Sequence, residues 1–246
     1  MKPLVAPAES GEATARHLIS TKRIFDEAAV SAALKDVLDG LTDPAEIQAA
    51  AVAVLQDAQK NGRAEIARAF AASPFNARPM TSAYCYLTDQ LVRTTLQIAG
   101  QRLHPIETLG PNDRLAVIGV GGYGRGEMAP YSDVDLLFLI PQTPSQRTEN
   151  LIESMLYMLW DLKLKVGHST RTIRDCVTLG REDFTIQTAL LEHRFIAADV
   201  ALAQDLDETL KTDLFAGTGR SFIEAKLEER DARHRKQGLR YVVEPN

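Results

Sequence analysis

The chain has 246 residues, of which 45% are hydrophobic and 25% are charged, and its formal net charge at pH 7 is −5. This composition is typical of a globular protein with one large domain or two small ones, and the net charge argues against general nucleic-acid binding. The N-terminus has no apolar signal-peptide core, and no stretch approaches the roughly 20 apolar residues that a membrane span needs. We therefore expect a cytoplasmic protein, in which the distant Cys85 and Cys176 are reduced core thiols.

The first hundred residues carry mainly helical signals. Residues 1–22 show no sustained hydrophobic period and are expected to form a loose arm, whereas apolar residues recur at helical spacing over 23–40. Residues 80–102 are also predicted to be helical, with apolar side chains along one side. Together these signals predict a helical leader over residues 1–104.

A strong helix start lies inside this leader, where Asp43 stands at the N-cap, Pro44 at the first helical position and Glu46 at the third. The alanine-rich run that follows predicts a helix to about Gln59. We expect Asn61-Gly62 to cap this helix at its C-terminus, and a second helix to follow it to about residue 72.

The stretch from Leu115 to Pro141 predicts a buried strand, a glycine-rich turn, a short helical turn, a loop and a second strand. The second strand carries Asp133 and Asp135, one residue apart. Because strand side chains alternate between faces, both carboxylates point the same way, with Cα atoms roughly 7 Å apart. Two carboxylates on one face suit a hard divalent cation that also holds a phosphate chain.

Gly119, Gly121 and Gly124 also match G-x-G-x-x-G, the dinucleotide-binding fingerprint, directly after an apolar run. That fingerprint requires a full helix after the glycines and an acidic residue about 20 residues further on. Here the next strand begins at about Asp133, too soon for the crossover of roughly a dozen residues that a parallel neighbour needs. Pro130 also lies in the gap, so the spacing argues against a dinucleotide fold.

The spacing fits a different pattern, G-G-x-x-R-G followed by S-D-x-D. The matching residues are Gly121, Gly122, Arg125 and Gly126, then Ser132, Asp133 and Asp135. This pattern resembles the nucleotidyltransferases with a DNA-polymerase-beta-like fold, in which a glycine pair ends one strand and D-x-D lies on the next. The glycines let backbone N–H groups approach a triphosphate, and the helix start adds a positive dipole.

The resemblance implies an α+β fold, in which a small mixed sheet with helices is flanked by the helical leader and a C-terminal helical bundle. It implies that Asp133 and Asp135 are the catalytic metal ligands, because the metal would neutralise charge as the phosphoryl bond breaks. The candidate phosphate-binding residues are Gly121, Gly122, Arg125 and Ser132.

The rest of the chain predicts one more strand among helices. A cap signature at Thr143–Gln146 opens a helix to about Lys163, and Leu164–Thr172 alternates as a third strand should. Further helices are predicted to dominate 173–199, 200–214 and 218–237, followed by the start of a strand at Arg240–Val243. We expect the nucleotidyltransferase core to span 105–175 and a helical region to span 176–246.

The predicted third strand supplies three candidate substrate contacts, His168, Ser169 and Arg171, because it should neighbour the D-x-D strand. Many members of this superfamily take a third carboxylate from this strand, but the segment LKVGHSTRT contains none. The number of metal ions and the identity of a general base therefore stay open. The candidate substitutes elsewhere are Asp161, Asp175 and Glu192.

Three longer segments, 121–141, 159–172 and 188–199, together resemble the amino-terminal nucleotidyltransferase part of the bacterial PII uridylyltransferases, which are also uridylyl-removing enzymes. The resemblance extends over about residues 110–246, and the first hundred residues are compatible with the family's variable helical leader.

This resemblance implies transfer of UMP from UTP to a tyrosine hydroxyl of the PII nitrogen-signalling protein, with Mg²⁺ or Mn²⁺ and release of pyrophosphate. In the family this modification signals low glutamine. The family's whole enzyme also has an HD-type hydrolase domain that removes UMP and two glutamine-sensing ACT domains. This sequence contains no His-Asp dipeptide, so we expect a transferase fragment of a larger multifunctional enzyme.

Two other functions are compatible with the motifs. The first is an adenylyltransferase that acts on another protein or on a small molecule such as an aminoglycoside, because D-x-D alone does not separate these acceptors. The second is a regulatory module that binds nucleotide without turnover, which the missing third acid favours and the intact glycine and D-x-D motifs oppose. A purely structural helical protein would leave the paired aspartates unexplained.

Overall fold

A four-stranded mixed sheet forms the centre of the computed structural model, which describes residues 17–217 and 219–237. The sheet order is β3-β2-β1-β4; β1 runs antiparallel to both of its neighbours, and β2 and β3 are parallel. The strands are β1 (Ala116–Gly119), β2 (Val134–Leu139), β3 (Val166–Arg171) and β4 (Arg194–Ala198). The predicted α+β fold with a small mixed sheet is therefore confirmed.

Side-chain alternation gives the sheet two faces, which are most distinct on β2. Leu136 and Phe138 pack into one hydrophobic cluster with the N-terminal helices, whereas Leu137 and Leu139 pack into a second cluster with the later helices. All four side chains are at most 1% exposed. Asp135 shares the face of Leu137 and Leu139, so its carboxylate lies at the end of a strand whose remainder is buried.

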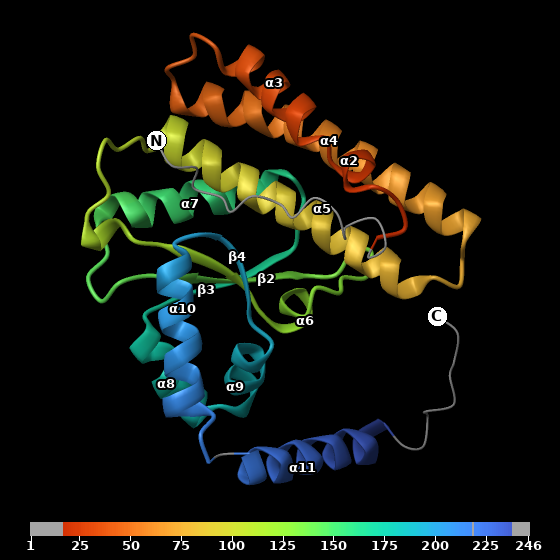
Figure 1. Cartoon of the computed structure of the whole chain (residues 1–246), viewed down its shortest axis with the longest axis vertical. Helices are drawn as coiled ribbons and strands as arrows, with labels where there is room; N and C mark the ends of the chain where they lie inside the picture. The colour runs from red at the N-terminus through yellow and green to blue at the C-terminus, as the bar shows by residue number, and fades with distance from the viewer. Residues whose placement is uncertain (1–16, 218, 238–246) are drawn as a thin grey trace.

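Helices from the first part of the chain, together with α7, cover one face of the sheet. Helices α5 and α7 lie next to the strands, and α3 and α4 form an outer layer (Figure 1). The Asp43 carboxylate accepts a 2.9 Å hydrogen bond from the Glu46 N–H, which confirms the predicted start of α4. These helices are α2 (Thr21–Ile24), α3 (Glu27–Leu38), α4 (Pro44–Ala72), α5 (Ala77–Ile98), which ends in a π turn (Ala99–Leu103), and α7 (Gln146–Asp161).

Helix α4 runs without a break through Asn61 and Gly62, so the predicted C-cap and second helix are wrong. Gly62 is buried, and a Cβ there would lie 2.4 Å from the Ile24 carbonyl oxygen and 2.9 Å from a Leu87 methyl carbon. The glycine therefore allows α2 and α5 to approach α4 closely. Tertiary packing, which the local sequence does not reveal, explains this residue better than capping does.

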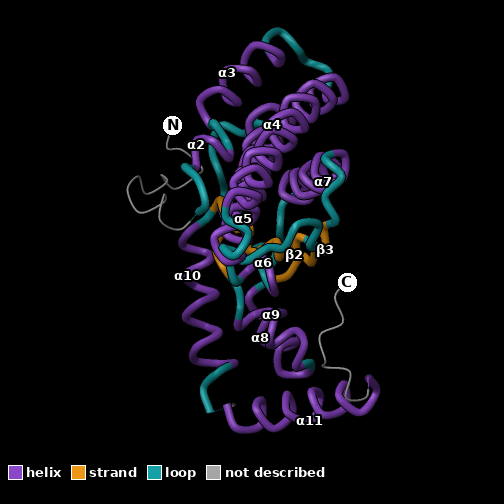
Figure 2. The backbone as a smooth tube through the Cα atoms, turned by 90° about the vertical axis from the view of Figure 1, so that its right-hand side faces the viewer, coloured by secondary structure: helices purple, strands orange, loops and turns teal. Residues whose placement is uncertain are grey.

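Helices from the second part of the chain cover the opposite face. Both views place α8, α9 and α10 across the sheet from α5 and α7, with α11 furthest from the sheet (Figures 1 and 2). No helix in the described part of the chain is both long and apolar enough to cross a membrane. The bounds are α8 (Ile173–Glu182), α9 (Phe184–Leu191), α10 (Val200–Thr209), which continues into a π turn (Leu210–Leu214), and α11 (Gly219–Gln237).

The prediction that 173–199 is largely helical is wrong at its end, because Arg194–Ala198 forms β4 and pairs with β1. The sheet therefore extends into the region 176–246 that was expected to be helical. The strand is short, and its pairing partner lies far earlier in the sequence, so local propensity gives little signal. Residues 1–16 of the predicted arm and the predicted strand start at 240–243 lie outside the described residues.

Candidate active site

The glycine-rich turn forms a single helical turn, α6 (Gly121–Gly124), directly after β1. The Val120 N–H donates a 3.0 Å hydrogen bond to the carbonyl oxygen of Asp135, which ties the start of α6 to β2. Gly121 has a φ of 58°, a left-handed conformation that favours glycine over other residues. The backbone geometry therefore places the start of a helical turn beside the D-x-D strand.

The Asp135 carboxylate lies between two glycines. A Cβ on Gly121 would be 3.3 Å from one carboxylate oxygen, and a Cβ on Gly167 would be 2.6 Å from the other. Gly167 is the register partner of Asp135 on β3, so the side chain that is missing there leaves room for the carboxylate. The predicted link between Asp135 and the diglycine turn is thus present, and Gly167 is a site residue that the sequence motif did not single out.

Asp133 lies just before β2 and adds a second negative charge. Burial, and then the nearby charge of Asp133, raise the pKa of Asp135 above its ordinary value. Within residues 17–217 and 219–237, neither carboxylate forms an ion pair with a basic side chain. Two acids that repel each other without a counter-ion form a donor set that fits a divalent cation.

Arg125 follows α6 directly, and its guanidinium lies beside the diglycine turn. One Nη atom would be 3.6 Å from a Cβ on Gly122, and the other donates a 2.6 Å hydrogen bond to the Glu192 carboxylate. Arg125 thus lies beside the diglycine turn, as the sequence predicted, but it has an acidic partner that the sequence did not predict. Ser132 is exposed in the loop that leads into β2.

The three candidates on β3 divide between the two faces of the sheet. Ser169 and Arg171 are the register partners of Leu137 and Leu139, so they share the face of Asp135. His168 points to the other face, where its ring lies 6.1 Å from the ring of Trp160 on α7. The structure therefore brings Ser169 and Arg171 to the Asp135 face and does not bring His168 there.

None of the three substitute acids joins the paired aspartates. Asp161 accepts a 3.1 Å hydrogen bond from Gln48 of α4, on the outer side of the molecule. Asp175 accepts a bond from the Thr172 N–H and caps α8, while Glu192 binds Arg125. Among the described residues, no group of three or more potential metal-binding side chains is found.

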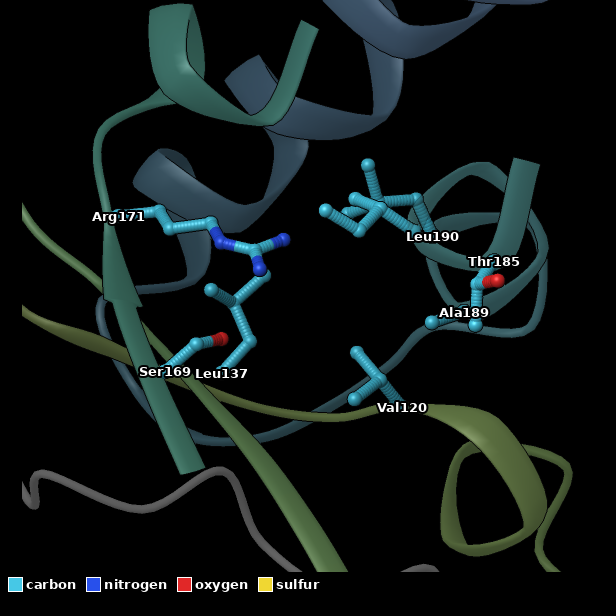
Figure 3. A pocket seen from close by; sticks show the side chains of 8 residues that line it. Val120, Leu137, Ser169, Arg171, Thr185, Ala189 and Leu190 are labelled. Carbon is cyan, nitrogen blue, oxygen red and sulfur yellow. The ribbon is translucent and has the colours of Figure 1, made fainter. Parts of the chain in front are cut away.

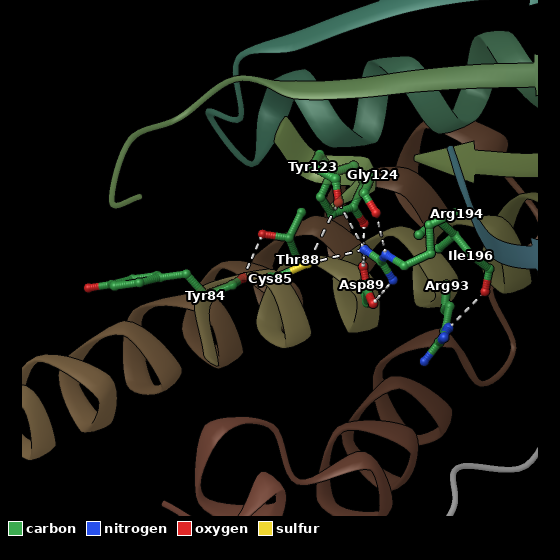
Figure 4. A network of polar contacts seen from close by, with 9 residues as sticks. All are labelled: Tyr84, Cys85, Thr88, Asp89, Arg93, Tyr123, Gly124, Arg194 and Ile196. Carbon is green, nitrogen blue, oxygen red and sulfur yellow. Dashed lines mark hydrogen bonds and ion pairs between the residues drawn. The ribbon is translucent and has the colours of Figure 1, made fainter. Parts of the chain in front are cut away.

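A buried polar network lies behind the diglycine turn and was not predicted (Figure 4). Arg194 of β4 donates bonds of 2.7 and 3.0 Å to Asp89 of α5, and a further bond of 3.2 Å to the carbonyl oxygen of Tyr123. The Tyr123 hydroxyl donates a 2.6 Å bond to Asp89, and burial raises the pKa of this tyrosine well above its usual range. One polar network thus joins the leader, α6 and β4.

The only sequence signal for this network is a lone aspartate inside an otherwise core-facing helix. Asp89 stands between Leu87 and Leu91, at a position that is 7% exposed. Its partner Arg194 is 105 residues away, so no local pattern connects them. The network shows that the helical leader is part of the structure that supports the site.

The mixed sheet, the short helical turn after β1 and the paired aspartates at the start of β2 are the arrangement expected of the nucleotidyltransferase fold. A comparison with family models agrees, because residues 11–159, more than half of the chain, match the model described as glutamate-ammonia ligase adenylyltransferase. The chain belongs to this family of nucleotidyltransferases.

Curated relatives are similar to almost the whole chain. They are named bifunctional uridylyltransferase/uridylyl-removing enzyme and come from Ruegeria pomeroyi (58% identical over 91% of this chain), Cereibacter sphaeroides (52% over 93%) and Rhodospirillum rubrum (42% over 92%). The chain spans about a quarter of the length of these relatives (24–25%). The resemblance to the uridylyltransferase family that the motifs indicated is therefore confirmed.

Proposed function

We propose that this chain carries the transferase site of a PII uridylyltransferase, which moves UMP from UTP to a tyrosine hydroxyl of a PII signalling protein. The relatives' name, uridylyltransferase, supports UTP as the nucleotide, because two of these relatives are 58% and 52% identical to this chain over nearly its whole length. The acceptor and the metal dependence follow from the family resemblance of the three segments between residues 121 and 199. A cytoplasmic location belongs to the same proposal.

The single observation that carries this proposal is the position of the Asp135 carboxylate between Gly121 and Gly167, with Asp133 adjacent. A bound Mg²⁺ or Mn²⁺ would neutralise phosphate charge there and favour the ionised form of the acceptor hydroxyl. Asp133 and Asp135 would hold this ion. The open backbone of Gly121 and Gly122 would position the triphosphate, and Arg125 would contact it.

The reaction that this arrangement supports is an in-line displacement at the α-phosphorus. The tyrosine oxygen forms a bond to phosphorus while the bond from phosphorus to the bridging α,β-oxygen breaks, and pyrophosphate leaves with the electron pair. The hydroxyl proton passes to solvent as the bond to phosphorus forms. Positioning and charge neutralisation are then the main contributions of the protein.

A second candidate is adenylyl transfer, which the name of the matching family model favours. That name says glutamate-ammonia ligase, whereas the relatives' names say uridylyltransferase, so the two comparisons indicate different nucleotides. We favour uridylyl transfer because the relatives match 91–93% of the chain and the family model matches residues 11–159.

A transfer assay tests the proposal directly. The chain is incubated with each of the four α-³²P nucleoside triphosphates, with Mg²⁺ or Mn²⁺, and with either PII or glutamate-ammonia ligase as the acceptor. We expect label from UTP on PII and equimolar pyrophosphate. Label from ATP on glutamate-ammonia ligase would establish the second candidate, and nucleotide binding without pyrophosphate release would establish a regulatory module.

A further inference from the structure

A cavity of about 140 Å³ lies on the Asp135 face of the sheet, between β2, β3 and helix α9 (Figure 3). Its walls are mainly apolar, and Leu137 and Leu190 are each only 1% exposed. The residues on which the argument depends are Val120, Leu137, Ser169, Arg171, Thr185 and Leu190.

The residues that line the cavity are neighbours of the proposed phosphate site along the chain and in the sheet. Val120, which lines it, immediately precedes Gly121 of the diglycine turn. On β3, Gly167 faces Asp135, and Ser169 and Arg171 follow at alternate positions on the same side. The backbone of Arg171 therefore stands about 13 Å along the strand from Gly167, and its long side chain can shorten the distance to a base beyond the α-phosphate.

Arg171 is the main polar feature of this cavity. Figure 3 shows its side chain extending from β3 into the cavity, over Leu137. Within the described ranges, Arg171 forms no ion pair, although its charge helps to lower the pKa of Asp175, whose carboxylate accepts from the N–H and hydroxyl of Thr172. A half-buried guanidinium that is outside any direct ion pair can donate hydrogen bonds to a neutral or anionic acceptor.

We propose that this cavity receives the pyrimidine base of the nucleotide, with the Arg171 guanidinium donating to the O4 carbonyl of uracil. The proposal rests on the proposed function, because it assigns the base subsite of the same active site. Leu137, Leu190 and Val120 provide apolar contacts for the flat ring, and the hydroxyls of Ser169 and Thr185 lie on the lining as further polar groups.

The chemistry of the guanidinium makes this contact selective. Arginine only donates hydrogen bonds, and uracil has an acceptor oxygen at position 4, where cytosine has an amino group that also donates. Adenine likewise has an amino group on the corresponding edge. A cytosine in the same position would place two donors against each other, so Arg171 accounts for a preference for UTP over CTP.

The acceptor tyrosine does not fit this position as well. The reacting atom of the tyrosine is its hydroxyl oxygen, and this oxygen has to lie beside Asp135 to reach the phosphorus. Arg171 lies four residues along β3 from Gly167, and a hydroxyl bound there would be far from the paired carboxylates. The cavity therefore suits the end of the nucleotide that does not react.

The experiment measures binding and needs no acceptor protein. Isothermal titration in Mg²⁺ compares three probes on the full chain: the α,β-methylene analogue of UTP, the same analogue of CTP, and inorganic tripolyphosphate. The variants are Arg171→Met, which keeps most of the side-chain stem, and Arg174→Met, a matched control on the exposed side of α8. Thermal unfolding of each variant verifies that it is folded.

We expect Arg171→Met to weaken binding of the UTP analogue about 10- to 100-fold, the usual range for losing a charged hydrogen bond. Arg171→Met should also lose the preference for UTP over CTP, and its binding of tripolyphosphate should be unchanged. The control Arg174→Met should bind all three probes as the natural chain does. Ala189→Phe, which places a large side chain in the cavity, should also weaken both nucleotide analogues and leave tripolyphosphate binding intact.

Three outcomes would overturn the inference. If Arg171→Met lost tripolyphosphate binding equally, Arg171 would be a phosphate contact. If Arg171→Met bound all probes as the natural chain does, the base would not bind in this cavity. If nucleotide binding by Arg171→Met were intact, and the separate transfer assay with PII showed only a raised KM for PII, the cavity would belong to the acceptor. A chain that bound the UTP analogue selectively through Arg171 but did not modify PII would refute the proposed acceptor and leave the base site standing.

Discussion

Arg194 and Asp89 form a buried ion pair across the boundary between the sheet and the leader, with two hydrogen bonds of 2.7 and 3.0 Å. The same guanidinium donates to the carbonyl oxygens of Tyr123 and Gly124, at the C-terminal end of α6. The pair thus stabilises the turn that carries the proposed phosphate site. The leader helix α5 has a direct role in shaping the site, although no residue of α5 belongs to the motif.

Removing one member of this pair should lower stability and weaken nucleotide binding. Arg194→Met leaves the Asp89 carboxylate, whose side chain is 10% exposed, without its cation. Such a change typically costs about 3–5 kcal/mol in the free energy of unfolding. We expect urea unfolding to show a loss of this order. Because the carbonyl groups of α6 lose their donor, we also expect the KM for UTP to rise more than kcat falls.

A double-mutant cycle distinguishes the pair from general packing. Asp89→Asn should cost much less in the Arg194→Met background than in the natural chain, because the uncompensated charge is then already removed. Arg78→Met is the control, since its ion pair with Glu127 has a distance of 3.3 Å and an arginine side chain that is 87% exposed. Additive costs for Asp89 and Arg194 would contradict a coupled pair.

Replacing both aspartates should abolish transfer and leave the fold intact. Asp133→Asn with Asp135→Asn keeps the shape of each side chain but removes the charges that would hold a divalent cation. We expect no detectable UMP transfer and a melting temperature at neutral pH about 1–3 °C above that of the natural chain, because the repulsion between the two acids is gone. Turnover in the pure double variant would disprove the catalytic role of this pair.

The pH dependence of stability should report the same repulsion. The pKa of Asp135 is raised in the folded chain, first by burial and then by Asp133. For an acid with a raised folded pKa, the contribution to stability is present below the unfolded value, about 3.9, and is lost as the pH rises through the folded pKa. Metal-free Asp135→Asn should therefore exceed the natural chain in stability above this window, and the difference should vanish at acid pH.

A carboxyl ¹³C titration of Asp135 by NMR provides the direct measurement. In the absence of metal, Asp133→Asn should lower the pKa of Asp135, because one of its two raising causes is removed. In the natural chain, added Mg²⁺ should move the acidic limb of kcat/KM to lower pH, because metal and protons compete for the same oxygens. An acidic limb that does not depend on Mg²⁺ would show that these carboxylates do not hold the ion.

The arrangement of the glycine turn beside the D-x-D strand was predictable because its determinants are local. Gly121, Asp133 and Asp135 lie within one strand–turn–strand unit, where spacing alone fixes their geometry. The features that were not predicted depend on contacts between distant segments. Gly62 matched a helix cap but allows two helices to approach, and β4 was assigned to a helix because its pairing with β1 leaves no local pattern.

Substitutions at two glycines near the site should separate effects on folding from effects on nucleotide binding. A Cβ on Gly167 would lie 2.6 Å from the Asp135 carboxylate, whereas a Cβ on Gly122 would meet only a nitrogen of Arg125, at 3.6 Å. Gly167→Ala should therefore lower both the melting temperature and kcat, because Asp135 has to move. Gly122→Ala should leave the melting temperature unchanged but raise the KM for UTP. An unchanged KM for UTP in Gly122→Ala would show that the triphosphate does not bind at this turn.

The ion pair between Arg125 and Glu192 has a distance of 2.6 Å and joins the end of α6 to the segment before β4. If Arg125 contacts a phosphate, the nucleotide competes with Glu192 for the same guanidinium. The carboxylate would then reduce the affinity for UTP, and its removal would release Arg125 for the ligand.

Glu192→Gln should therefore lower the KM for UTP a few-fold, and Arg125→Met should raise it. In the Arg125→Met background, the Glu192 change should have no effect on KM, because the competing group is gone. Glu127→Gln is the matched control, since this glutamate also pairs with an arginine near the same turn but does not bind Arg125. Steady-state kinetics at constant ionic strength provide the measurement. A higher KM in Glu192→Gln would show that the carboxylate instead holds Arg125 in its productive position.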